Sequence, residues 1–199
     1  ERMWNSMKRK RSARNRRARR CLFLILLALL ALLLIWPRTV HLEGLISPYA
    51  ILVDADSGES VAEKEADVSI YPASMTKVMT ALLALEANPD LEQPVTLPED
   101  IFPELRAEGA SMAGFRPGET ATVRDLLYGA LLPSGAECCE ALAREVSGSE
   151  EAFVELMNQK AAELGMRSTH FCNPTGLHDP EHVSTVRDMA RLLRAAMQN

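Results

Sequence analysis

Apolar residues recur along the second half of this chain at the spacing of amphipathic helices. Within residues 123–131 they occupy positions i, i+3, i+4, i+7 and i+8, and Pro133 follows directly. Similar runs begin after Ser134 and Ser149, and a last run spans residues 189–196. The spacing therefore predicts four helices after residue 122, with no repeat among them.

The first half of the chain predicts a hairpin and one buried helix. Residues 49–54 and 59–62 have strand composition and flank a turn at residues 55–58, which indicates a β-hairpin. Residues 78–85 are apolar nearly all round, so the helix they predict should be buried, and Pro89 should end it. Residues 90–121 are rich in Pro, Gly and acids, which favours loops with short extended pieces.

Three helix starts carry a hydroxyl residue followed three positions later by a carboxylate, the pattern of a capping box: Thr122 with Asp125, Ser134 with Glu137, and Thr185 with Asp188. Ser74 has the same hydroxyl position, but Lys77 stands where an acid is expected. An ammonium group is disfavoured at the positive end of a helix dipole. This exception indicates a chemical role for the pair.

Ser74 and Lys77 are one helical turn apart and share a face. A serine hydroxyl is a weak nucleophile until a base takes its proton, and burial at a helix start lowers the pKa of a lysine. The pair therefore predicts nucleophilic catalysis, with a plain helix start and a solvated lysine as the alternative. Ser134 is read either as a simple helix cap or as a hydroxyl that points into a cleft and shuttles protons.

Charge divides the chain sharply. Residues 8–20 carry nine positive charges and no acid, whereas the part from Cys21 onward has 12 basic and 26 acidic residues, a net charge of −14. Residues 21–36 between these parts are uniformly apolar and would span roughly 24 Å as a helix, slightly less than a bilayer core. This pattern predicts a basic cytoplasmic segment (1–20), a membrane anchor (21–36), a linker (37–48) and an extracytoplasmic domain (49–199). A cleaved signal peptide is the alternative for 21–36, and a nucleic-acid-binding arm is disfavoured for the basic run.

Cysteine and histidine spacings do not indicate a metal site. Cys138 and Cys139 are expected as small buried residues, although a disulfide from either to Cys172 is permitted outside the cytoplasm. His178 and His182 are four residues apart, but Pro180 between them argues against one helix face.

Four segments together resemble the penicillin-binding D-alanyl-D-alanine carboxypeptidases, the low-molecular-mass serine peptidases of bacterial cell walls. They occur in the family's order within residues 49–199: 72–77 (PASMTK), 126–135 (LLYGALLPSG), 153–158 (FVELMN) and 170–177 (HFCNPTGL). The resemblance implies an α/β fold of the penicillin-recognising serine peptidase type (β-lactamase/transpeptidase-like), preceded here by a transmembrane helix. It also implies no metal or organic cofactor.

The resemblance assigns a role to each motif residue. Ser74 is the nucleophile, Lys77 its base, and Ser134 the proton relay, while Gly135 and Ala136 contribute to substrate binding. The implied substrates are peptidoglycan stem peptides, the implied covalent inhibitors are β-lactam antibiotics, and the implied location is the outer side of a bacterial cell membrane. Nucleic acid is not an expected partner.

Two departures from the family pattern bear on activity. The middle motif reads Ser134-Gly135-Ala136, where the family usually has an asparagine at the third position, and no K-T-G strand occurs within the 199 residues. We therefore interpret the sequence as the first part of a carboxypeptidase domain, and expect these residues alone not to hydrolyse a D-Ala-D-Ala peptide. A catalytically silent wall-binding or scaffold protein of the same fold is the alternative. A β-lactamase is disfavoured, because the residues around the motifs match the carboxypeptidases. Glu155 resembles the glutamate of the class A β-lactamase loop, but it lies in a smooth helical period and is expected at the surface.

Overall fold

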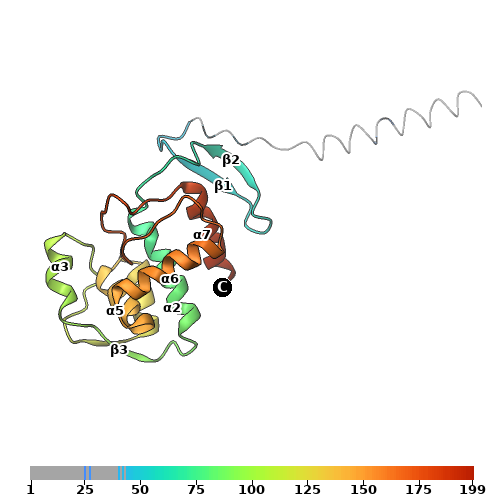
Figure 1. Ribbon diagram of the computed structural model, residues 1–199. Helices are drawn as coiled ribbons and strands as arrows, with labels where there is room; N and C mark the ends of the chain where they lie inside the picture. Colours follow the sequence, from blue (N-terminus) through green and yellow to red (C-terminus); the bar gives the residue numbers. More distant parts are fainter. Residues whose placement is uncertain (1–24, 26, 28–39, 41, 43) are drawn as a thin grey trace, which may run out of the picture. The chain divides into compact units, whose positions relative to one another are not determined.

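The computed structural model describes residues 44–199 together with residues 25, 27, 40 and 42. Within them the chain forms, in order, β1 (Ala50–Val53), β2 (Ser60–Lys64), the 3-10 turn η1 (Ala73–Thr76), α2 (Lys77–Ala87), β3 (Pro94–Thr96), α3 (Ile101–Ala107), β4 (Thr120–Thr122), α4 (Val123–Leu131), α5 (Ala136–Ser147), α6 (Glu150–Glu163) and α7 (Val186–Gln198) (Figure 1). The predicted segment 1–20 and nearly all of the apolar segment 21–36 lie outside the described residues. In the part of the chain that is described, no helix has both the length and the apolarity needed to cross a bilayer.

The predicted hairpin is confirmed. Strand β1 pairs antiparallel with β2, from Ala50 opposite Lys64 to Val53 opposite Ser60, with a register shift beside Leu52. The turn between them closes on Asp54, whose carboxylate accepts a hydrogen bond from the backbone N–H of Ser57. Helix α7 packs against β1, and Figure 1 shows the two side by side.

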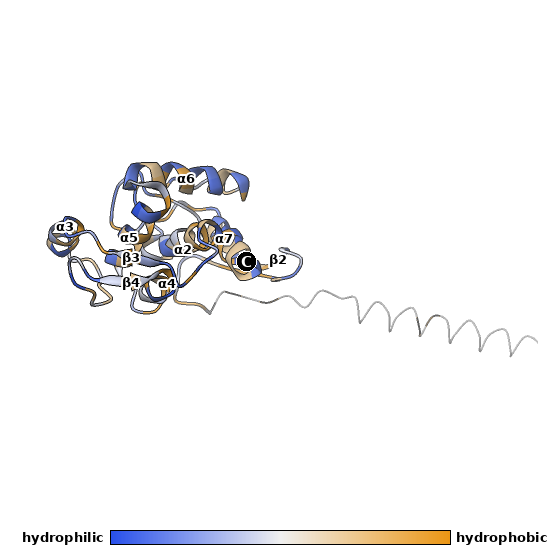
Figure 2. Cartoon of the chain, turned by 90° about the horizontal axis from the view of Figure 1, so that it is seen from below, coloured by the Kyte–Doolittle hydropathy of each residue, from blue (hydrophilic) through white to orange (hydrophobic). Residues whose placement is uncertain are grey.

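Helix α2 lies between two hydrophobic clusters, which explains why its sequence is apolar nearly all round. Ala81 and Ala84 face the cluster formed by β3, β4, α3, α4 and α5. Met79, Leu82 and Leu83 face the second cluster, which includes residues of α6 and α7. Figure 2 shows α2 enclosed among the other helices, while α6 carries hydrophilic residues on its outward side. The prediction of a buried helix is confirmed.

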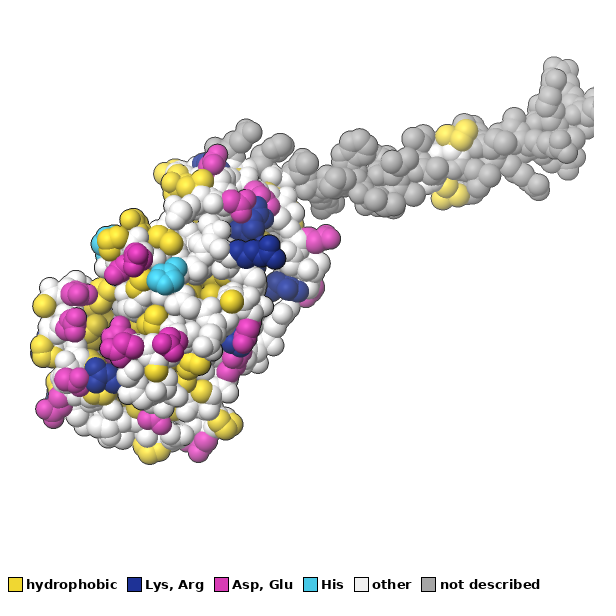
Figure 3. All heavy atoms as spheres, in the orientation of Figure 1, with side chains coloured by type: hydrophobic (Ala, Val, Ile, Leu, Met, Phe, Trp, Pro, Cys, Tyr) yellow, Lys and Arg dark blue, Asp and Glu magenta, His cyan; other side chains and the backbone are white. Residues whose placement is uncertain are grey.

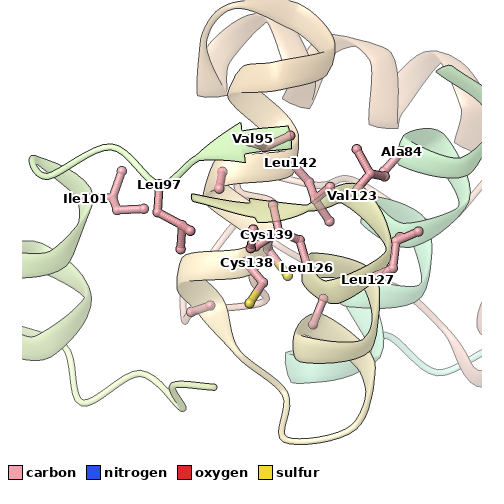
Figure 4. Packing of buried hydrophobic residues seen from close by; sticks show 14 of the residues in the cluster. Ala84, Val95, Leu97, Ile101, Val123, Leu126, Leu127, Cys138, Cys139 and Leu142 are labelled. Atoms are coloured by element: carbon pink, nitrogen blue, oxygen red, sulfur yellow. The ribbon is translucent and has the colours of Figure 1, made fainter. Parts of the chain in front are cut away.

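The first cluster is packed beneath the β3–β4 pair. Figure 4 shows Val95 beside Leu142 and above Leu126, with Cys138 and Cys139 close to Leu126. Cys138 and Cys139 are both free and fully buried, as expected for small apolar residues. Cys172 is also a free thiol, so the structure forms none of the permitted disulfides among the described residues.

Helix α3 arises in the region that the sequence predicted as loops with short extended pieces, and the strands β3 and β4 are two such pieces. The seven-residue helix α3 buries Ile101, Phe102 and Leu105 against the first cluster. Pro103 lies in its first turn, where proline is tolerated because that N–H has no partner inside the helix. Strand β4 has three residues and pairs with β3. Two turns of helix carry too little periodicity for a sequence signal.

The three predicted capping boxes have three different outcomes. Thr122 and Asp125 form the complete reciprocal box at the start of α4. At α7 only half forms: Thr185 accepts from the N–H of Asp188, but the Asp188 carboxylate accepts from Ser168 and Thr169 instead. The box predicted at Ser134 does not form, because the N-cap of α5 is Gly135 and the Glu137 carboxylate binds the backbone of Ala113.

Candidate active site

Ser74 lies in the short 3-10 turn η1, ahead of α2, and its side chain is exposed. Its hydroxyl makes no capping hydrogen bond, so the expectation that it occupies a helix-cap position is wrong. The oxygen instead accepts a bond from Lys77 Nζ at 3.0 Å and one from Ser134 Oγ at 3.0 Å. The hydroxyl is thus available to side chains rather than to the helix backbone.

Lys77 is the first residue of α2 and is only 5% exposed. Its ammonium nitrogen donates to Ser74 Oγ and, at 2.6 Å, to the carbonyl oxygen of Thr175. Burial lowers the pKa of Lys77 from its ordinary value, while electrostatic interactions with Cys139 and Glu137 act to raise it. A buried lysine with a lowered pKa, in contact with a serine hydroxyl, can act as its general base.

The loop at residues 173–177 presents the Thr175 carbonyl to the lysine. Asn173 Oδ1 accepts from the backbone N–H of Thr175 and of Gly176, which is an Asx-type turn. Gly176 has a φ of 78°, and a Cβ there would lie 1.9 Å from the carbonyl oxygen of Ala73. This loop therefore packs backbone to backbone against the turn that carries Ser74. The sequence indicated a turn here but did not reveal the carbonyl contact.

Ser134 belongs to the loop between α4 and α5, not to the helix cap. Its φ is 63°, in the left-handed region, and its hydroxyl donates to Ser74. The N-cap of α5 is Gly135, which makes no side-chain cap. A Cβ on Gly135 would lie 2.6 Å from the Cβ of Ala113, so this position needs glycine for close packing. The capping interpretation of Ser134 is therefore wrong, and its hydroxyl is directed at Ser74 instead.

Ala136 is 1% exposed and its methyl group packs in the first hydrophobic cluster. Its backbone N–H donates to the Ser111 carbonyl. Its side chain is a methyl group, so it offers no polar atom to the site. Glu137, expected to close a capping box, is completely buried and accepts instead from the backbone N–H groups of Ala113 and Gly114, at 2.7 and 2.9 Å. Its other carboxylate oxygen has no partner among the described residues. Glu137 thus anchors the segment against which Gly135 packs.

His182 supports the turn that carries Ser74. It is 2% exposed, and its Nδ1 accepts from the backbone N–H of Cys172, so Nε2 carries the proton and donates to Thr76 Oγ1 at 2.8 Å. Burial lowers the pKa of His182 to about 4, which keeps the ring neutral. His178 instead lies with its ring edge-on to Tyr71. The two histidines therefore have separate structural contacts rather than a shared ligand.

Two neighbouring residues and one from a distant part of the chain meet at this site: an exposed serine, a buried lysine and a second serine, joined through the Ser74 oxygen. Glu155, considered in the sequence as a possible catalytic glutamate, lies exposed on α6. A nucleophilic serine with a lysine partner and a second serine defines the penicillin-recognising class of serine enzymes.

The comparison with known proteins identifies the family. The profile of the D-alanyl-D-alanine carboxypeptidase family of peptidases matches residues 38–199, and the chain belongs to that family. It is 38% identical over 149 residues to D-alanyl-D-alanine carboxypeptidase DacF of Bacillus subtilis, covering 75% of this chain and 38% of that protein. It is 41% identical over 157 residues to DacC of Escherichia coli, covering 75% and 39%. The chain thus spans about two fifths of the length of these two relatives.

A solved structure gives the same result for the fold. Penicillin binding protein 6B of Escherichia coli superposes with a TM-score of 0.75 at 29% identity, covering 81% of this chain and 53% of that one. The expected α/β fold of the penicillin-binding proteins is therefore confirmed.

Proposed function

We propose that this protein is a serine-type D-alanyl-D-alanine carboxypeptidase, which removes the terminal D-alanine from peptidoglycan stem peptides through an acyl-enzyme. The observation that carries the proposal is the hydrogen-bonded chain from Lys77 through Ser74 to Ser134, with the lysine buried and its pKa lowered. The activity named for the two relatives supports the same reaction.

The reaction follows from the positions of the three side chains. Neutral Lys77 takes the proton of Ser74, and the Ser74 oxygen attacks the carbonyl of the penultimate D-alanine. The backbone N–H of Ser74 stabilises the oxyanion. Ser134, 3.0 Å from the attacking oxygen, gives its hydroxyl proton to the departing amine of the terminal D-alanine and regains a proton from protonated Lys77, which becomes neutral again. Water then cleaves the ester on Ser74. Gly135 and Ala136 are buried behind Ser134, so they act on substrate binding by fixing the position of the loop. β-Lactams acylate the same serine.

Thr175 contributes to this scheme by holding the lysine in place. Its carbonyl accepts a 2.6 Å bond from Lys77, which keeps the amine directed towards Ser74 after a proton is lost. The carbonyl also stabilises the protonated form, so it partly opposes the effect of burial on the lysine pKa. The contact with Thr175 therefore holds Lys77 in position but favours the charged ammonium form, so less of the lysine is neutral and ready to take a proton.

A second candidate function is a catalytically silent wall-binding or scaffold protein with the same fold. The observation that favours it is Ala136, whose buried methyl group cannot replace a side-chain amide that binds both lysine and substrate. This alternative retains stem-peptide binding without acyl transfer.

We further propose that residues 21–36 anchor the protein in the cell membrane, with residues 1–20 in the cytoplasm and the domain from residue 49 outside. The proposal rests on nine positive charges directly before sixteen apolar residues. Fractionation of bacterial membranes, followed by protease treatment of intact spheroplasts, tests it. Recovery of the protein in the soluble cytoplasm would contradict it.

The enzymatic proposal is tested by acylation with a fluorescent penicillin, using the product of the full open reading frame. We expect covalent labelling of wild type and of a control variant, Ser57→Ala in the exposed hairpin turn, but none of Ser74→Ala. Lys77→Arg should also remain unlabelled, because an arginine does not give up its proton. Release of D-alanine from a D-Ala-D-Ala peptide completes the test. Unlabelled wild type that still binds cell walls would establish the scaffold function instead.

A further inference from the structure

A cleft of about 300 Å³ opens between α3, α5, the start of α6 and the loop at residues 172–179. Six carboxylates line it against a single arginine, Arg144: those of Asp100, Glu104, Glu108, Glu140, Glu150 and Asp179. Figure 3 shows the acidic side chains gathered around one basic side chain over α3 and α5. The cleft is distinct from the catalytic cluster but adjoins it, because Thr175 lines the cleft and also binds Lys77.

Glu140 is the residue that distinguishes this cleft from an ordinary acidic surface. It projects from α5 and is 6% exposed. Among the described residues its carboxylate forms no hydrogen bond and no ion pair, and its oxygens keep only slight contact with solvent. Arg144, one turn further along, does not neutralise it, because its guanidinium group is paired bidentately with Asp100 at 3.0 and 2.8 Å. A buried carboxylate without a counter-ion is costly, so it either keeps a proton or gains a cationic partner.

The pKa of Glu140 depends on its burial and on charged residues of α3, α5 and α6. The pKa of Glu140 is raised to about 8, chiefly by burial and also by the negative charges of Glu150, Glu104 and Asp100, while Arg144 acts to lower it. The pKa of Glu150 is also raised, mainly by burial. The other titratable groups that line the same cleft are Glu108, Cys172, His178 and Asp179. An empty cleft therefore retains a proton on Glu140 near neutral pH, and a bound cation would replace that proton.

The shape of the cleft selects the kind of cation. Among the described residues, no group of His, Cys, Asp or Glu side chains converges closely enough for a metal ion. Ile101, Leu105 and Leu177 form apolar wall next to the carboxylates, which suits a methylene chain. An ammonium group has three donors and can bind several carboxylates at once. We propose that this cleft binds the ammonium group of an aliphatic amine, with Glu140 as its buried counter-ion.

Calorimetric titration with 1,5-diaminopentane tests the proposal. Because alkylammonium groups stay charged up to about pH 10, a change in affinity between pH 6 and 8.5 reflects the titration of groups on the protein and not of the ligand. We expect the dissociation constant to tighten at least about tenfold over this range as Glu140 loses its proton. Glu140→Gln should weaken binding and remove most of the pH dependence. Glu59→Gln on the hairpin, the same chemical change at an exposed position outside the cleft, should have neither effect.

Two further ligands and a second variant distinguish the possible sources of the amine and serve as controls. Nα-acetyl-L-lysine N-methylamide carries the same ammonium on a peptide unit, so the tighter of the two ligands shows whether the natural source is a free amine or a peptide side chain. 1,5-Pentanediol, which has no charge, should not bind. If Glu140→Gln does not fold, Glu104→Gln on the exposed side of α3 should weaken binding in the same direction. Equal affinity of wild type and these variants, or binding of Ca²⁺ in preference to both amines, would overturn the proposal.

Discussion

Replacing Gly176 by alanine tests the packing on which the catalytic arrangement depends. The new Cβ would lie 1.9 Å from the carbonyl oxygen of Ala73 and 2.4 Å from its carbonyl carbon. Both are backbone atoms of the turn that carries Ser74, so neither can yield by a side-chain rotation. The loop and the turn must therefore separate, and the Thr175 carbonyl must move away from Lys77.

The magnitude follows from two separable effects. An alanine at a φ of 78° costs about 1–2 kcal/mol, because its Cβ crowds the following carbonyl. Overpacking against fixed backbone adds about 1–3 kcal/mol. Gly165→Ala is a matched control: its φ is 71°, but no atom lies within 4 Å of the new Cβ. We therefore expect about 2–5 kcal/mol of destabilisation at Gly176 and about 1–2 kcal/mol at Gly165.

Urea denaturation of the purified proteins measures both losses, and thermal melting gives an independent check, with about 2–4 °C per kcal/mol for a domain of this size. Gly176→Ala should also slow acylation of Ser74, whereas Gly165→Ala should not. Equal losses of stability in the two variants would refute the reasoning, since the backbone contact would then contribute nothing.

Two further predictions concern stability. Because burial lowers the pKa of His182 to about 4, the unfolded chain binds an extra proton between about pH 6.5 and 4, and stability falls as the pH falls through this window. From pH 7.5 to 5, wild type should lose about 2 kcal/mol more than His182→Gln in urea titrations; parallel curves would contradict the buried neutral ring. Thr122→Ala, which removes a true cap, should cost about 1 kcal/mol, whereas Ser134→Ala should cost less than about 0.5 kcal/mol. A larger loss at Ser134 would mean that its hydroxyl stabilises the fold.

The sequence predicted the hairpin and five of the six α-helices among the described residues, but it missed α3. The periodic helices share long apolar stripes and recognisable starts, such as Thr122 at α4 and Ser149 at α6. Helix α3 has only two turns, and its apolar residues form a helix because the first hydrophobic cluster buries them. Short elements of this kind are stabilised by tertiary contacts rather than by their own propensity.

Sequence motifs also identified the three side chains that meet at the site, but not how each is used. Ser134 matches a capping pattern as well as Thr122 does, and both are followed by an acid at the third position. Only the left-handed backbone at Ser134, and the attachment of Glu137 to the backbone of Ala113, show that one pattern is a cap and the other is not.

By itself the sequence determined what is local: helical period, the hairpin turn, the cap at Thr122, and the one-turn spacing that brings Ser74 beside Lys77. These interactions join residues within a few positions, so they can be inferred from spacing. The tertiary structure decided the contacts between distant residues: Ser74 with Ser134, 60 positions apart, Lys77 with the Thr175 carbonyl, 98 apart, and Thr76 with His182, 106 apart. Their geometry depends on how the helices pack and on the few backbone atoms, such as those at Gly176, that must touch.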